Sequence, residues 1–179
     1  MKKLMLIGRV AAGKTTLTQA LRGEQIHYCK TQYIKYTDTI IDTPGEYTEV
    51  NKLGAALAIY AYEADIVGIV ISADEPFCVF PPNITPMVNR EVVGIVSGVD
   101  KPEANVEQVT RWLKLCGCKK IFYISSYTGE GIWQLLEYLR EPGDVLPWDN
   151  EKDANRARKV LSTKSADEPP APCPQQEKQ

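Results

Sequence analysis

Short apolar runs alternate along the chain with stretches in which apolar residues recur every three or four positions. The runs rich in β-branched and other apolar residues predict strands at residues 3–7, 33–36, 39–41, 66–72, 92–97 and 121–125. The stretches with helical spacing predict helices at residues 14–21, 51–63, 106–115 and 131–139. Because almost wholly apolar strands alternate with amphipathic helices, the pattern predicts an α/β fold with a doubly wound, mostly parallel sheet covered on both faces.

Three breaks in this pattern refine the picture. Thr37-Asp38, between the second and third predicted strands, is typical of a hairpin turn and predicts one antiparallel edge strand. Residues 73–89 contain four prolines and predict a loop where a covering helix would be usual. The end of the chain is polar and rich in proline, which predicts a largely disordered tail. We therefore expect a domain over residues 1–148 and a tail over residues 149–179.

Composition and charge narrow the classes of partner. The chain is 44% hydrophobic and carries a net charge of −2, without a basic run of the kind that binds nucleic acid. It has no run of about 18 consecutive apolar residues, so we expect no membrane span. Gly and Lys interrupt the apolar N-terminus, which argues against a signal peptide and favours a cytoplasmic protein with reduced cysteines.

The connection between the first strand and the first helix has the spacing of a phosphate-binding loop: Gly, four residues, then Gly-Lys-Thr. Its residues are Gly8, Arg9, Val10, Ala11, Ala12, Gly13, Lys14 and Thr15, and Thr16 continues the site into the helix. A strand–loop–helix of this kind directs backbone N–H groups and the positive end of the helix at phosphates. We expect Lys14 to face solvent in the empty protein, and to contact the β- and γ-phosphates as a catalytic cation. The Thr15 hydroxyl would ligate Mg²⁺. The sequence thus predicts a P-loop NTPase with a Ras-like sheet.

A second signature, DTPG, follows the third predicted strand. Asp42 ends an apolar strand, the position at which a Walker-B carboxylate holds Mg²⁺. Gly45 would turn its N–H toward a γ-phosphate. Thr31 lies in the loop before the second strand, where a third Mg²⁺ ligand belongs in the triphosphate state. Glu46 occupies the place of the usual Gln, so it is either a catalytic residue that orients water, with slow hydrolysis, or a solvated surface residue.

The elements that would read the base are altered. GTPases end the fifth strand with Asn-Lys-x-Asp, in which the Lys stem lies across the base and the Asp accepts hydrogen bonds from guanine. Here Ser97 and Gly98 replace the first two residues, whereas Asp100 is kept. Loss of these contacts weakens base discrimination, so the nucleotide is expected to be ATP or GTP. In a second interpretation Asp100 only begins the next helix, together with Pro102.

The last predicted strand leads into a loop similar to the base-binding Ser-Ala-Lys loop of small GTPases. Ser125 and Ser126 begin this loop, and the letters TGEG follow at residues 128–131, as in many small GTPases. Ser125 and Ser126 are therefore further candidates for nucleotide binding.

With these residues in place, the sequence resembles the EutP/PduV family of small P-loop proteins, which are encoded with ethanolamine- and propanediol-utilisation microcompartments. The resemblance covers about residues 1–141 and rests on GRVAAGKTTL, KTQ at residues 30–32, IDTPGEY at residues 41–47 and the SxxD of residues 97–100. Family members more often keep a Lys at the position of Gly98. The resemblance implies a Ras-like fold, nucleoside triphosphate binding, a role in amine or diol catabolism and a link to a bacterial microcompartment. The family is also described as ATP-binding and connected with an acetate-kinase activity.

Three functions fit these features. The first is a Mg²⁺-dependent NTPase switch, in which loops that sense the γ-phosphate are read by a partner. The second is a kinase that transfers the γ-phosphate to acetate, with Arg9 and Lys30 as the cationic clamp and residues 73–89 as the lid. The third is a non-catalytic module that docks on microcompartment proteins through that same loop.

Overall fold

The computed structural model describes residues 1–23, 35–36, 39–45 and 61–146. Its sheet has the strand order β2-β3-β1-β4-β5-β6. The strands are β1 (Leu4–Ile7), β2 (Lys35–Tyr36), β3 (Ile40–Asp42), β4 (Ile66–Ser72), β5 (Glu91–Ser97) and β6 (Ile121–Ile124). All neighbours from β3 to β6 in this order pair in parallel, as the apolar strands predict. At the edge, β2 pairs antiparallel with β3, and the predicted turn at Thr37-Asp38 lies outside the described residues.

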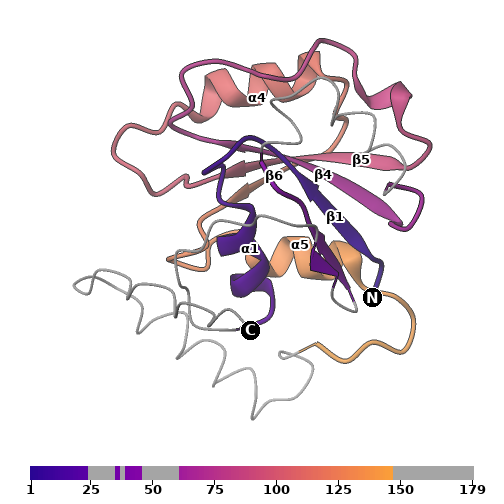
Figure 1. Cartoon of the computed structure of the whole chain (residues 1–179). Coiled ribbons are helices and arrows are strands. Elements are labelled where there is room, and N and C mark those ends of the chain that lie inside the picture. Colours follow the sequence, from indigo (N-terminus) through magenta and orange to yellow (C-terminus); the bar gives the residue numbers. More distant parts are fainter. Residues whose placement is uncertain (24–34, 37–38, 46–60, 147–179) are drawn as a thin grey trace, which may run out of the picture.

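Helices cover both faces of the sheet (Figure 1). Helices α1 (Lys14–Leu21) and α5 (Ile132–Leu139) lie on one face, and α4 (Val106–Leu115) lies on the other. Helices α1 and α4 begin and end at the predicted residues. The predicted helix at residues 51–63 falls almost entirely outside the described part of the chain. Among the described residues, no helix has both the length and the apolar character needed to cross a membrane.

Local chemistry explains the bounds of α4. The Asn105 side chain caps the helix by accepting a hydrogen bond of 3.1 Å from the backbone N–H of Gln108. Val109 and Leu113 are fully buried against the sheet, four residues apart on one face. Gly117 follows the helix with φ 98°, a conformation that favours glycine, and begins the turn toward β6.

The core has two layers because side chains alternate across each strand. Leu4 and Leu6 of β1 pack with the buried residues of α1 and α5. Met5 and Ile7 point to the other face and pack with the buried residues of α4. Such a double-sided core holds the carboxyl ends of the central strands at one edge of the sheet, where α/β proteins bind their ligands.

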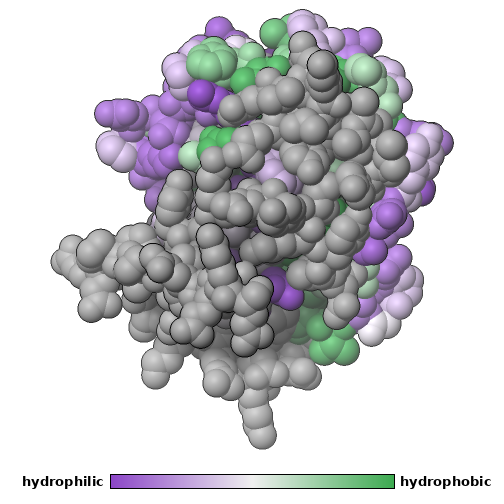
Figure 2. All heavy atoms as spheres, viewed as in Figure 1, coloured by the Kyte–Doolittle hydropathy of each residue, from purple (hydrophilic) through white to green (hydrophobic). Residues whose placement is uncertain are grey.

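Residues 73–89 form the predicted loop, with a single 3₁₀ turn, η1 (Thr85–Met87). The loop docks on the end of α4, where the Asn83 N–H donates to the Leu115 carbonyl at 2.7 Å. Figure 2 shows hydrophobic and hydrophilic residues intermixed over this upper part of the molecule. Three large apolar side chains of the loop and of α4 are at least half exposed: Phe77, Met87 and Leu115.

Candidate functional site

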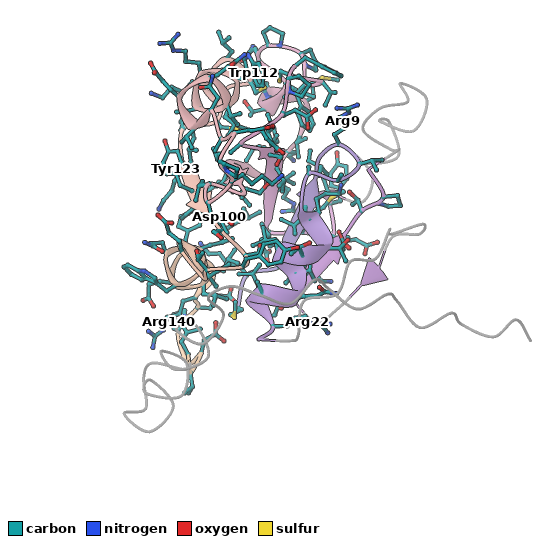
Figure 3. The ribbon with its side chains drawn as sticks, turned by 90° about the vertical axis from the view of Figure 1, so that its left-hand side faces the viewer. Arg9, Arg22, Asp100, Trp112, Tyr123 and Arg140 are labelled. Atoms are coloured by element: carbon teal, nitrogen blue, oxygen red, sulfur yellow. The ribbon has the colours of Figure 1, made fainter. Side chains whose placement is uncertain are left out.

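The predicted phosphate-binding loop joins β1 to α1, at the edge where the parallel strands end. The loops that follow β1 and β5 carry Arg9 and Asp100, which are labelled in Figure 3. Ala11, in the middle of the phosphate-binding loop, adopts φ 64°, a region that residues with a Cβ rarely occupy. Unfavourable backbone conformations of this kind cluster at ligand sites.

Lys14 differs from the expectation that it faces solvent. The residue is 6% exposed, and its ammonium donates hydrogen bonds to the carbonyl oxygens of Gly8 (2.8 Å) and Arg9 (2.9 Å). The loop folds back over the side chain, so backbone carbonyls replace the water that would otherwise solvate the charge. The carbonyls of the loop therefore hold the cation inside the loop.

Thr15 and Asp42 come together from neighbouring elements. The pairing of β1 with β3 sets Asp42 opposite Leu6, and the Thr15 hydroxyl donates a 2.9 Å hydrogen bond to the Asp42 carboxylate. Asp42 is 2% exposed, and the Thr43 hydroxyl fixes the following turn by donating to the Leu6 carbonyl at 2.7 Å. A hydroxyl and a carboxylate beside a phosphate-binding loop form the hard oxygen donor set that suits Mg²⁺. These two side chains thus fit the predicted metal role.

Gly45 packs directly against the phosphate-binding loop. A Cβ at this position would overlap the backbone nitrogen and Cα of Val10 and the carbonyl carbon of Arg9. Only glycine therefore allows the DTPG segment to approach the loop so closely. The structure thus places Gly45 beside the predicted phosphate-binding residues, and the direction of its N–H toward a γ-phosphate stays a prediction.

Arg9 connects the loop of residues 73–89 to the phosphate-binding loop. Its guanidinium forms an ion pair with Glu75 and lies 4.7 Å from the centroid of the Phe77 ring. Glu75 and Phe77 were not predicted as neighbours of Arg9, because they lie 66 and 68 residues beyond it along the chain. The available signal was the Pro-rich character of their loop, which marked it as unusual but gave no contact.

Among the residues predicted to surround the base, Ser97 contacts the phosphate-binding loop. Its hydroxyl donates a 2.7 Å hydrogen bond to the Ala12 carbonyl. Asp100 is exposed, in a turn closed by a 3.2 Å hydrogen bond from the Lys101 N–H to the Gly98 carbonyl. Because α4 begins at Val106, the alternative in which Asp100 starts that helix is wrong.

Ser125 and Ser126 follow β6 at the same edge of the sheet. Both are buried, and the Ser125 hydroxyl accepts a 3.1 Å hydrogen bond from the Thr128 N–H, which shapes the loop. A 3.4 Å hydrogen bond from the Val99 N–H to the Ile124 carbonyl joins the end of β6 to the loop that carries Asp100. Thr16, the third residue of α1, is partly buried. Three further predicted residues lie outside the described part of the chain: Thr31, Glu46 and Lys30.

Comparison with solved structures supports the predicted fold. The structure of Era in complex with MgGDPNP and nucleotides 1506-1542 of 16S ribosomal RNA matches with a TM-score of 0.56 at 22% sequence identity. The match covers 83% of this chain and 60% of the Era chain, so this chain spans about three fifths of that protein. The predicted P-loop NTPase α/β fold is therefore confirmed.

Comparison with known sequences identifies the family. The propanediol utilization protein PduV of Citrobacter freundii is 43% identical over 140 residues, which cover 78% of this chain and 93% of PduV. The probable acetate kinase EutP of Escherichia coli (strain K12) is 32% identical over 142 residues, which cover 78% of this chain and 89% of EutP. The profile of the family described as PduV-EutP, Ethanolamine utilisation - propanediol utilisation, matches residues 1–141. The chain belongs to the PduV-EutP family.

Proposed function

We propose that this protein binds a nucleoside triphosphate with Mg²⁺ and hydrolyses it slowly, as a switch in ethanolamine or propanediol utilisation. The observation that carries the proposal is that three predicted site residues come together. Thr15 is hydrogen-bonded to Asp42, and Gly45 packs on the phosphate-binding loop at Arg9. Membership of the PduV-EutP family supports the assignment to this metabolism. The proposed location is the cytoplasm, in association with a bacterial microcompartment.

Each residue of the loop has a proposed role. The backbone N–H groups of residues 8–16 and the Lys14 ammonium would hold the phosphates, and Thr15 and Asp42 would hold Mg²⁺. When bound, the metal neutralises charge on the phosphate oxygens. Thr31 would add a metal ligand in the triphosphate state, and Glu46 would orient the attacking water.

The proposed switch depends on Gly45. Its close contact with Val10 means that a γ-phosphate bound at the loop would act on the DTPG segment directly. Loss of the γ-phosphate would then release the segment, which is how order in such loops reports nucleotide state. A partner protein, proposed to come from the microcompartment, would read this difference.

Release of inorganic phosphate tests the proposal. We expect the purified protein to release phosphate from MgATP or MgGTP, and Lys14→Ala to remove both this activity and tight triphosphate binding. Lys114→Ala is the matched control, because Lys114 is an exposed lysine of α4. Unchanged nucleotide binding by Lys14→Ala would overturn the assignment of the phosphate site.

Phosphoryl transfer to acetate is a second candidate. Arg9 is held by Glu75 and Phe77, so the candidate clamp and the candidate lid lie in contact. The name of the relative EutP, probable acetate kinase, supports this candidate. An acetate oxygen would bond to the γ-phosphorus as the bond to the β-γ bridging oxygen breaks, which gives acetyl phosphate and the nucleoside diphosphate.

The products separate the candidates. With acetate present, acetyl phosphate trapped by hydroxylamine would identify the kinase, whereas free phosphate independent of acetate would identify the NTPase. Tight nucleotide binding with neither product would identify the third possibility, a non-catalytic module that docks on microcompartment proteins.

A further inference from the structure

A lysine side chain lies over Gly98, although the sequence has no lysine at that position. Gly98 adopts φ 66°, and a Cβ built on it would lie 2.9 Å from Cε and 3.2 Å from Cδ of Lys101. The aliphatic part of Lys101 therefore runs through the space that a side chain at residue 98 would enter. Position 98 is the place at which GTPases carry the lysine whose stem crosses the base.

Two acceptors at the end of β4 hold the Lys101 side chain in this course. Its ammonium lies 2.8 Å from both carboxylate oxygens of Asp74 and 3.0 Å from the Ser72 hydroxyl oxygen. Partial burial of Asp74 acts to raise the pKa of its carboxyl group, but hydrogen bonds from Lys101 and Ser72 outweigh this effect, so the pKa is lowered. The carboxylate thus stays ionised and fixes the ammonium.

Ser97 and Ser72 link the Lys101 stem to the edge of the sheet that carries the phosphate-binding loop. Ser97 precedes Gly98 and is bonded to the Ala12 carbonyl, and Ser72 is paired with Ser97 across β4 and β5. Asp100, the candidate base reader labelled in Figure 3, immediately precedes Lys101. The ammonium is neutralised at Asp74, which leaves the methylene groups as the part of Lys101 available to a flat apolar surface.

We propose that Lys101 supplies from a different position the base-covering stem that Gly98 lacks, and so contributes to binding the purine of the nucleotide. This inference rests on the proposed nucleotide-binding function. A methylene stem covers adenine and guanine alike, so Lys101 sets affinity for purine nucleotides and leaves their relative preference unchanged. Asp74 acts as a positioning residue, because it contacts the lysine and not the base.

Affinities of Lys101 variants test the proposal. Ribose-labelled fluorescent ATP and GTP report nucleotide binding, and Mg·tripolyphosphate, which has no base, reports the phosphate site alone by calorimetry. We expect Lys101→Ala to lower the affinity for both nucleotides by about five- to tenfold and to leave the affinity for tripolyphosphate unchanged. Lys101→Met keeps an unbranched stem, so we expect its affinity for nucleotides to stay within about threefold of the original. Asp74→Asn should lower the affinity for nucleotides less than Lys101→Ala does.

Lys114→Ala controls for the removal of a lysine, and thermal unfolding checks that each variant is folded. Equal nucleotide affinity for Lys101→Ala and the original protein would overturn the inference and leave the proposed function standing. An equal loss for tripolyphosphate would also overturn it, because the effect would then concern the phosphates. If the original protein bound neither nucleotides nor tripolyphosphate, the proposed function would fail, and the inference with it.

Discussion

The Ser97 hydroxyl donates a 2.7 Å hydrogen bond to the Ala12 carbonyl, and so ties the end of β5 to the phosphate-binding loop across 85 residues of sequence. Ser97 is 5% exposed, which shields this bond from water. Because the Ser97 hydroxyl donates its proton to a carbonyl of the loop, Ser97 tethers the phosphate-binding loop to β5. Its position in the altered Asn-Lys-x-Asp motif alone would have suggested a weakened contact to the base.

Ser97→Ala should therefore loosen the loop without altering base preference. A buried carbonyl would lose one donor, so we expect a loss of about 1 kcal/mol in the free energy of unfolding. The affinities for ATP and GTP should fall by similar factors, as measured by calorimetry on the folded variant. A loss confined to GTP would contradict the tether and assign Ser97 to the base.

Asp42→Asn should act mainly through the metal. The substitution preserves the shape of a side chain that accepts a hydrogen bond from Thr15, but removes the charge that would attract Mg²⁺. We expect nucleotide affinity to fall about tenfold or more in Mg²⁺ and to change by less than about threefold in EDTA. Equal losses in both buffers would mark Asp42 as a structural residue of the turn after β3.

Asp100→Ala should lower the affinity for GTP and leave the affinity for ATP nearly unchanged. A carboxylate accepts hydrogen bonds from the amino and imino groups of guanine, and adenine lacks that pair of donors. Because Asp100 is exposed and the neighbouring motif residues are replaced, we expect ATP and GTP to bind the original protein within about tenfold of each other. Competition titrations measure both values. A preference for guanine that survives Asp100→Ala would mean that other residues read the base.

Cys78 should be the most reactive of the described cysteines near neutral pH. A hydrogen bond with the Cys116 thiol lowers the pKa of Cys78 to about 7, although partial burial acts against this shift. Burial raises the pKa of Cys118 to about 11, and the pKa of Cys116 is also raised, first by its hydrogen bond with Cys78. Only the thiolate is alkylated readily, so the rate at Cys78 should rise from pH 6 to pH 8 with a midpoint of about 7.

Iodoacetamide labelling followed by peptide mass mapping checks this order. Mapping keeps the signal of Cys78 separate from those of Cys29 and Cys173, which lie outside the described residues. Faster labelling of Cys116 or Cys118 than of Cys78 would contradict the assignment.

The sequence predicted the elements whose signals are local. The apolar runs predicted the described strands to within about a residue or two at their ends, and helical spacing predicted the bounds of α1 and α4. The places of the phosphate-binding loop and of Asp42 in the fold were also predictable, because their short motifs lie at the ends of apolar strands. Thr31 and Glu46 stay predictions, since they lie outside the described residues.

Contacts between distant segments were not predictable in this way. The burial of Lys14 depends on how the loop folds over it, and the ion pair of Arg9 with Glu75 depends on where residues 73–89 dock. The course of Lys101 over Gly98 is likewise set by Asp74, which lies 27 residues earlier. A motif specifies residues that are near one another in the sequence, whereas these contacts depend on how distant segments pack around the sheet.

The contact between Gly45 and the phosphate-binding loop joins two main chains with no side chain between them. Side chains usually absorb small displacements by changing rotamer, and this contact has no such compliant layer. A ligand that moves the backbone at Val10 must therefore move the backbone at Gly45 in the same step. In the proposed switch, a signal passed through this pair would depend on direct contact between the two main chains, and a single methyl group at residue 45 would force the two segments apart.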